Sequence, residues 1–380
     1  MILLLMLCIG LIGANSLVLS PIAANVAMGL GVDNAAQVMT AAGIYGIGVA
    51  LSALFLAPRA DRVGAHKALM TALILITLGL GLSGVAPAMW ALNLGQGLTG
   101  VGVGMALPAI YSLAAIIAPK GQESRVMGLV LTGWTLSMVG GVTLAAHIAD
   151  LWGWRMVFFL LTGGMVVIFL VVRSARFPVQ PTSERVTSPF SALQVPGILP
   201  ALFSVVMLGT GFYGIYTYLG AHLTGNLGRE VSEAGWLTLS YGLGFGAATL
   251  VDPWLDKVGP RRGLLAVFGA LGVYYGFASL WTASYAVLVA VMFGWGVLQH
   301  LGLNLTVSRL SQLDPSQRGA VMGMNSTVMY VSVFGATFLF RPVFEGGGLA
   351  ACFWGASALA ALGAAEALVA RMRARQSGLA

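Results

Sequence analysis

The chain has 380 residues, of which 58% are hydrophobic and only 8% are charged. An ordinary soluble domain carries roughly 25% charged residues, because polar surface must cover its core. The composition therefore excludes an ordinary soluble protein, and the net charge of +7 has to be interpreted by where the basic residues fall.

The apolar residues form runs of about 20 or more, the length at which an α-helix crosses a bilayer. Because lipid offers no partner for unpaired backbone groups, we expect an all-α integral membrane protein. The first six predicted spans are 2–28, 35–57, 68–86, 89–117, 124–148 and 155–173. The second six are 198–222, 233–251, 263–282, 284–307, 320–341 and 348–370. The 52 glycines favour close packing of such helices.

The first run also admits interpretation as a cleaved signal peptide, because ANVA at 24–27 is similar to a cleavage site. No basic residue precedes the run, and its removal would leave an odd number of spans, so we expect a membrane helix. Cys8 and Cys352 lie in the first and last spans, where a disulfide framework is not expected.

The basic residues divide unevenly between the two sides of the predicted membrane. With the N-terminus in the cytoplasm, sixteen Lys and Arg fall in inside loops and the tail, and only Arg155, Arg229 and Arg341 fall at outside ends. Cytoplasmic loops are the ones that carry excess Lys and Arg. We therefore expect a multi-pass protein of the inner (cytoplasmic) membrane with both termini in the cytoplasm. The positive charge then indicates topology and not a nucleic-acid partner.

Two short sequences occur twice. DRVGAHK at 61–67 recurs as DKVGPRR at 256–262, and VMG at 126–128 recurs at 321–323, both with an offset of 195 residues. A shared offset of about half the chain indicates a duplicated unit of six spans in parallel orientation. We predict two pseudo-symmetric six-helix bundles, at 1–173 and 198–370. A polar cytoplasmic linker at 174–197 joins them, and 371–380 forms a cytoplasmic tail.

Two six-helix halves, a central loop and a charged loop after each half's second span resemble the major facilitator superfamily, over essentially the whole chain. The loop signature of that family is a glycine followed by D-R/K-x-G-R/K-R/K. The positions that match it are Asp61, Arg62, Gly64, Lys67, Asp256, Lys257, Gly259, Arg261 and Arg262. The chain departs from the signature at Ala57 and Asp252, which replace the glycine, and at Ala65, which replaces a basic residue.

The resemblance implies that these loops latch the two halves together on the cytoplasmic side while the carrier faces outward. Gly64 permits a tight turn or a positive φ, and Asp61 suits a neighbouring helix N-terminus. Arg62 and Lys67 can bind carbonyls, carboxylates or lipid phosphates, and Arg125 is the expected partner of Asp61. Surface pairs worth about 0–1 kcal/mol each suit a latch that must open. The same charges can instead serve only to fix topology.

Three further stretches narrow the resemblance: LSPIAANV in the first span, GWRMVFFLL at 153–161 and GIYTYLGAHL at 214–223. They resemble arabinose-efflux-permease-like carriers in the drug:proton antiporter branch. The resemblance implies a secondary active transporter that exports a sugar, drug or metabolite, and not an enzyme. An uptake carrier, an uncoupled facilitator and a non-transporting membrane sensor stay open as alternatives.

In this fold the substrate lies near mid-membrane between the halves, so polar and aromatic residues inside spans are the candidates. Each can instead make an interhelical hydrogen bond within one half. The candidate substrate-binding residues are Asn15, Gln96, Tyr111, Trp134, Tyr213, Tyr216, Trp295, Gln299, His300, Asn304 and Asn325.

The antiporter branch usually has an acid in span one and an arginine in span four, where this chain has Asn15 and Asn93. His300 is then the mid-span group that can change charge near neutral pH, so we expect proton coupling to pass through it. The alternative is a neutral histidine bonded to a neighbouring helix. A path without a buried acid or base favours a neutral or weakly polar solute.

No cofactor or metal is expected. The G-x-G-x-x-G pattern within 95–104 lies inside an apolar span with no preceding strand, so close helix packing explains it better than dinucleotide binding. The four histidines are dispersed, and none has the partner spacing of a zinc site. The expected partners are a small-molecule substrate, protons and membrane lipid, with the chain acting as a monomer.

Overall fold

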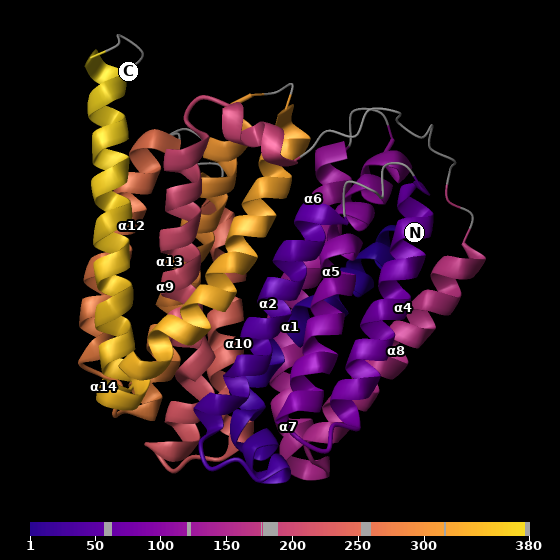
Figure 1. Cartoon of the computed structure of the whole chain (residues 1–380). Helices are drawn as coiled ribbons and strands as arrows, with labels where there is room; N and C mark the ends of the chain where they lie inside the picture. The colour runs from indigo at the N-terminus through magenta and orange to yellow at the C-terminus, as the bar shows by residue number, and fades with distance from the viewer. Residues whose placement is uncertain are drawn as a thin grey trace.

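The computed structural model describes residues 1–56, 63–119, 123–175, 177, 189–251, 260–314 and 317–376. Within these residues all regular secondary structure is helical, and the helices stand side by side (Figure 1). Ten of the described segments are long and apolar enough to cross a membrane. The predicted all-α membrane class is therefore confirmed.

The first half of the chain follows the predicted spans closely. Its helices are α1 (Ile2–Leu30), α2 (Ala35–Phe55), α4 (Ala65–Gly84), α5 (Met89–Ile117) and α8 (Trp154–Ser174). The fifth predicted span is continuous but changes its winding: α6 (Glu123–Leu136) passes through a π-helical segment, η1 (Ser137–Val142), into α7 (Thr143–Trp152). The π-helical segment contains the Gly140–Gly141 pair. A π-helical turn holds one more residue than an α-helical turn, and glycine has no side chain that would hinder this widening.

The second half contains α9 (Ile198–Gly225), α10 (Val231–Ala247), α12 (Pro260–Ser279), α13 (Tyr285–Ser311) and α14 (Arg318–Gln376). A short 3-10 segment, η3 (Ala248–Val251), ends α10. α14 is two helices that meet at Gly348, whose φ of 64° and ψ of −164° are not helical. Glycine adopts this conformation without a Cβ clash, so the chain reverses there within very few residues.

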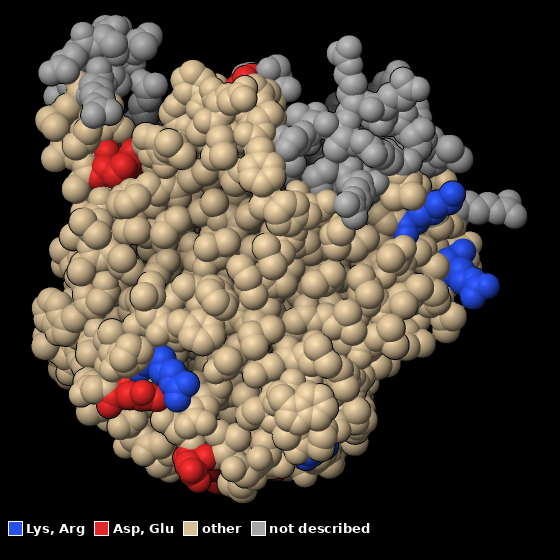
Figure 2. Space-filling view, viewed as in Figure 1, with Lys and Arg blue, Asp and Glu red and all other residues tan. Residues whose placement is uncertain are grey.

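The two ends of the bundle differ in what they carry. The N-terminus and the last turns of α14 lie in the upper part of Figure 1, at what we call the terminal face, and the turns after α1, α7 and α9 lie at the opposite face. The turn after α1 is tight because Gly31 is left-handed (φ 65°) and Asn34 caps α2 by accepting from the Ala36 N–H at 2.9 Å. Figure 2 shows a side of the molecule that is almost uncharged between these two ends, as a lipid-facing surface requires.

Part of the predicted linker belongs to the second half. Residues 189–194 form a short 3-10 helix, η2 (Pro189–Gln194), and residues 176 and 178–188 lie outside the described residues. Ala192 and Val195 are buried in one cluster with Ile198 and Val321, and η2 packs against α9 and α14. The division at 174–197 into two bundles and a linker stays a prediction.

The most extensive contacts between the halves pair α2 with α14, α1 with α9, and the η1–α7 segment with α10. Several hydrogen bonds between described residues of the two halves lie toward the opposite face. There the Thr143 hydroxyl donates to the Gly235 carbonyl (3.1 Å), and the Asn34 amide donates to Glu345 (3.4 Å). The structure is therefore closed at the opposite face.

Candidate functional site

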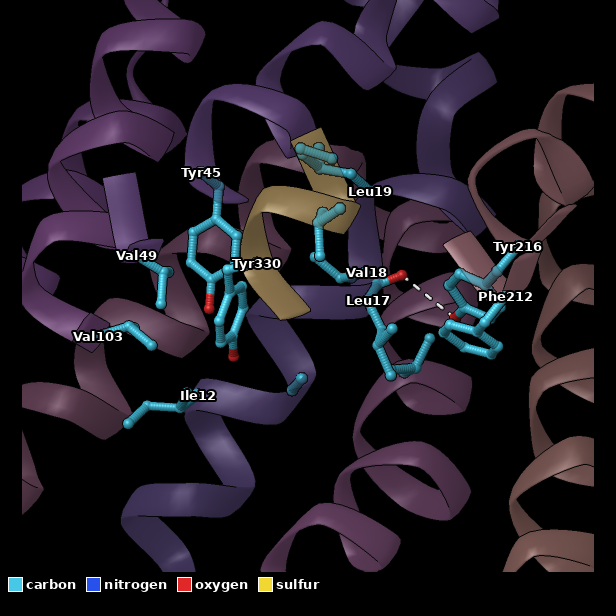
Figure 3. Packing of buried hydrophobic residues seen from close by; sticks show 14 of the residues in the cluster. Ile12, Leu17, Val18, Leu19, Tyr45, Val49, Val103, Phe212, Tyr216 and Tyr330 are labelled. Atoms are coloured by element: carbon cyan, nitrogen blue, oxygen red, sulfur yellow. Dashed lines mark hydrogen bonds between the residues drawn. The ribbon is translucent and has the colours of Figure 1, made fainter. Parts of the chain in front are cut away.

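Four tyrosines meet at the centre of the molecule, two from each half. They are Tyr45 of α2, Tyr111 of α5, Tyr213 of α9 and Tyr330 of α14, and we call them the tyrosine cluster. The rings of Tyr45 and Tyr330 pack edge to face with centroids 6.2 Å apart, beside α1 (Figure 3). The phenols of Tyr45, Tyr111 and Tyr213 are all electrostatic neighbours of the Tyr330 hydroxyl.

The cluster is polar without being charged. The Ser16 hydroxyl lies 2.6 Å from the Tyr45 hydroxyl, and the Tyr111 hydroxyl lies against the indole of Trp134. Tyr45 and Tyr330 are only 2% and 7% exposed, whereas Tyr111, Tyr213 and Trp134 are half-buried. Phenol groups can both donate and accept hydrogen bonds, and their rings can stack on a flat ligand. The arrangement suits a ligand with an aromatic ring and a few hydroxyl or carbonyl groups.

A chain of ring contacts leads from the cluster into the second half. Tyr213 packs on Phe212 (4.8 Å between centroids), and Phe212 packs on Tyr241 (5.5 Å). Tyr241 in turn packs on Phe245 (6.1 Å), whose ring meets the half-buried His300 at 4.8 Å. An aromatic wall thus connects the cluster to the predicted proton-coupling residue.

Other predicted site residues are used inside one half. Asn15 donates to Gln96 at 3.2 Å, and Gln96 donates to the Ser83 hydroxyl at 3.0 Å, so the three join α1, α5 and α4. Trp295 is fully buried within the second half, where its indole N–H donates to the Tyr275 hydroxyl at 2.9 Å. The structure does not bring Asn15, Gln96 or Trp295 into the tyrosine cluster.

The remaining predicted substrate-binding residues lie in different environments. Tyr216 lies at the contact between α1 and α9 near the opposite face, and Asn304 is half-buried on α13. Gln299 and Asn325 are buried, and within the described residues the side-chain oxygen of each has no hydrogen-bond partner. These two amides can accept from a donor on a ligand or from water.

The predicted cytoplasmic latch lies mostly outside the described residues. This applies to Asp61, Arg62, Asp256, Lys257 and Gly259, and to the side chain of Arg125. Gly64 is described and has φ 90°, the positive value that a tight turn into α4 allows for glycine. Lys67 and Arg262 are exposed, so the pairing of these charges stays a prediction.

Two features of the structure were not predicted from the sequence: three residues of the central site and one ion pair. Tyr45, Tyr330 and Ser16 also lie inside predicted spans, so the rule that selected Tyr111 and Tyr213 applies to them equally. The second feature is a buried ion pair: Arg309 of α13 binds both carboxylate oxygens of Glu366 of α14, at 2.7 and 2.8 Å. The two side chains are only 13% and 14% exposed, and the Ser204 hydroxyl contacts both.

A membrane-embedded helical bundle whose halves meet around an uncharged aromatic centre, closed at one face, has the organisation of a transporter. Residues 5–221, more than half of the chain, match the profile of the Major Facilitator Superfamily. The chain belongs to this superfamily. It is a multi-pass membrane protein and a secondary transporter, not an enzyme, and the resemblance carried by its loops is confirmed.

Several proteins are similar over large parts of the chain. The uncharacterized MFS-type transporter YwfA of Bacillus subtilis is 28% identical over 360 residues, which cover 92% of this chain and 87% of that protein. The inner membrane transport protein YdhP of Escherichia coli is 31% identical over 223 residues, covering 57% and 56%. A chloramphenicol efflux pump of Mycobacterium tuberculosis is 24% identical over 237 residues, covering 60% and 54%.

Proposed function

We propose that the protein exports a small, neutral or weakly polar solute that carries an aromatic ring, in exchange for protons. The single observation that carries this proposal is the tyrosine cluster, which both halves build and which contains no charge. The electrostatic neighbours of its hydroxyls in the described part of the chain are other tyrosines, Ser16 and Trp134. A charged ligand there would lose its hydration without gaining a counter-ion.

The proposal includes twelve membrane helices in two related halves. Among the described segments, ten are long and apolar enough to span a membrane. The longest of these, Ala320–Met372, is broken at Gly348 into two helices, and α12 runs beside α13 and α14 as a further helix of 20 residues. Six helices then precede the linker and six follow it, which is the arrangement that the 195-residue offset predicts.

The proposal also assigns the terminal face to the cytoplasm of a cell bounded by an inner membrane. The excess of Lys and Arg in the loops predicted on that side supports the assignment. The structure, closed at the opposite face, is then the inward-facing state. A similar protein is named a chloramphenicol efflux pump, and chloramphenicol is an uncharged aromatic compound, which supports export of this solute class.

Counterflow in proteoliposomes tests the substrate class. We expect vesicles preloaded with chloramphenicol to accumulate labelled chloramphenicol, and we expect Tyr330→Ala to lower the rate at least about tenfold, since the variant removes a central ring. Tyr285→Ala is the matched control, because the Tyr285 hydroxyl bonds to the Glu233 carbonyl near the opposite face, away from the cluster. Salt-sensitive transport of methyl viologen or 4-nitrophenyl phosphate, with none of chloramphenicol, would contradict a neutral site.

A pH gradient tests the coupling. If His300 carries the proton, His300→Ala vesicles lose accumulation driven by a pH gradient but keep counterflow, because exchange needs no net proton movement. His66→Ala is the control, since His66 bonds to the Val172 carbonyl at 3.0 Å within the first half. Full pH-driven transport by the His300 variant would leave facilitated diffusion or another coupling ion.

A further inference from the structure

The first membrane helix contains a proline at the point where it crosses the other half. Pro21 lies inside α1 and has no N–H, so the carbonyl of Leu17, four residues earlier, loses its usual helical donor. Leu17 is only 3% exposed, which leaves bulk water little access to this carbonyl. A buried carbonyl without a donor is unfavourable, so its partner has to come from elsewhere.

The partner comes from the other half of the molecule. The hydroxyl of Tyr216, on α9, donates to the Leu17 carbonyl at 3.3 Å, and Figure 3 shows this bond joining the two helices. Tyr216 is 2% exposed, and its ring stacks on Phe212 with centroids 5.3 Å apart and planes at 18°. Stacking holds the phenol in the orientation that reaches α1.

A second set of bonds runs in the reverse direction. The Ser20 hydroxyl of α1 donates to the Tyr216 carbonyl at 2.5 Å and accepts from the Gly220 N–H at 3.4 Å. These two groups are four residues apart, so they are the two ends of one helical hydrogen bond of α9. Ser20 therefore binds across a single turn of α9, while Tyr216 supplies the bond that Pro21 removed from α1.

Close approach of the two backbones is possible only at a glycine. A Cβ on Gly220 would collide with the backbone carbonyl of Ser20 and press against Pro21. Glycine thus permits the crossing, and the proline and serine next to it provide the polar groups that hold it. A small cavity lies beside the contact, with Ser16, Ser20, Tyr213, Tyr216 and Thr217 among its lining residues.

We propose that Leu17, Ser20, Tyr216 and Gly220 form an uncharged latch that closes the opposite face. Because Pro21 removes the helical donor of the Leu17 carbonyl, this carbonyl depends on Tyr216 of the other half for its hydrogen bond. The inference rests on the proposed transport function, in which the two halves meet and part at each face in turn. The Leu17 carbonyl is paired when the halves meet and loses its protein donor when they part. Since no member of the latch ionises near neutral pH, its strength is insensitive to salt and pH, unlike the charged loops predicted at the terminal face.

Spectroscopic distances across the opposite face test the latch without any substrate. Cys8 and Cys352 are free and buried, so both are first replaced by alanine. Spin labels are placed at D33C, in the exposed turn after α1, and N226C, in the exposed turn after α9. We expect Tyr216→Phe to lower the ratio of closed to open populations about tenfold, the effect of removing one buried hydrogen bond and leaving its acceptor unpaired.

Tyr218→Phe is the matched control. The Tyr218 hydroxyl donates to the Thr337 carbonyl within the second half, so its loss removes a similarly buried bond that does not cross between the halves. This variant is expected to change the ratio less than about twofold. Equal effects of the two variants, or no effect of Tyr216→Phe, would overturn the latch.

A double variant tests the role of the proline. Pro21→Ala restores an N–H to α1 and gives the Leu17 carbonyl its own helical partner, so adding Tyr216→Phe in this background is expected to change the ratio less than about twofold. An undiminished tenfold effect in that background would contradict the role of Pro21. If the Pro21 variant does not give monodisperse protein, Ser20→Ala, compared with Tyr218→Phe, decides whether the reverse bonds hold the latch. Because these readouts need no ligand, a failure of the proposed substrate class leaves them unaffected.

Discussion

Polar residues within the spans serve two separate purposes, and their neighbours decide which. Asn15 and Gln96 satisfy each other and are buried between helices of the first half. Tyr45 and Tyr330 come from different halves, so their contact must change when the halves move. Under the proposed function, residues of the second kind are the candidates for binding a solute that passes between the halves.

Gln96 provides a test of this distinction. Gln96→Leu removes three hydrogen bonds, two with Asn15 and one with Ser83, at a buried site, so we expect the free energy of unfolding to fall by about 1–3 kcal/mol. Thermal unfolding of the purified protein measures this, and the KM for chloramphenicol counterflow is expected to stay unchanged. Gln312→Leu, at an exposed position near the end of α13, is the control. A raised KM with normal stability would show instead that Gln96 binds the substrate.

The buried ion pair predicts a larger effect on stability. Glu366→Leu leaves the Arg309 guanidinium without its carboxylate at a site that is only 13% exposed, at a cost of about 3–5 kcal/mol. Replacing both residues, as R309M with E366L, is expected to recover most of that loss, because no buried charge is then unpaired.

The exposed pair of Arg341 and Glu345 is the natural comparison. Its atoms lie 2.9 Å apart, but the side chains are 34% and 41% exposed, so Glu345→Leu is expected to change stability by about 0–1 kcal/mol. Unfolding midpoints of the three variants, measured in one detergent, check the order. Equal losses for Glu366→Leu and Glu345→Leu would show that the buried pair is solvated.

Part of the tyrosine cluster could be predicted from the sequence, although its role as a binding site stays a proposal. Tyr111, Trp134 and Tyr213 were predicted and do lie in or against the cluster. Trp295 was predicted by the same rule, as an aromatic residue inside a span, but it is buried inside one half. In a soluble helix the polar side marks the surface, whereas these helices are apolar all round. The residues of a span therefore do not reveal which side faces the other half.

At the scale of the helices, the sequence predicted span boundaries well because bilayer thickness fixes their length. The π-helical turn of η1 and the 3-10 helix η2 were not predicted. Neither has a hydrophobic period of its own, since η1 is inserted into a longer span and η2 is held by packing on α9 and α14. Such segments depend on tertiary contacts that no local pattern encodes.

The crossing of α1 and α9 leads to a prediction at this scale. Gly220→Ala places a methyl group against the Ser20 carbonyl, so the helices must separate and the opposite face cannot close fully. We expect counterflow to fall more than about tenfold, because each cycle requires closure, while the protein stays folded. Gly163→Ala in α8, where an added Cβ meets no atom within 4 Å, is the control. A normal rate for the Gly220 variant would contradict a crossing that must close.

At the scale of the whole molecule, the duplication predicted from a 195-residue offset explains why both halves contribute equally to the centre. Two tyrosines come from each half, although the tyrosines themselves are not related by the offset: Tyr45 corresponds to Ser240, and Tyr330 to Thr135. The tyrosines of the cluster are therefore not part of the predicted repeat. A repeat can thus predict the halves and their interface without predicting what the interface binds.

Contacts between described helices of the two halves are extensive, so the chain should tolerate a break in the predicted linker. We expect fragments 1–183 and 184–380, expressed together, to copurify and to catalyse counterflow, because α2–α14, α1–α9 and α7–α10 contacts are all retained. The break leaves η2 with the second half, where Ala192 and Val195 are buried. Neither fragment alone is expected to transport, since each supplies only two of the four central tyrosines.

A break within the second half provides the contrast. Cutting after Gly228 separates α9 from α10 and α13, against which α9 packs inside one bundle. The cut also exposes the aromatic rings of Phe212, Tyr241 and Trp295, which pack on one another. Fragments 1–228 and 229–380 are therefore expected to recover less than about a tenth of the activity of the pair divided at the linker. Equal recovery from both pairs would mean that the second half does not assemble as a unit. Activity from the Gly228 pair alone would place the boundary between moving bodies after α9, with the latch of Ser20 and Tyr216 inside one of them.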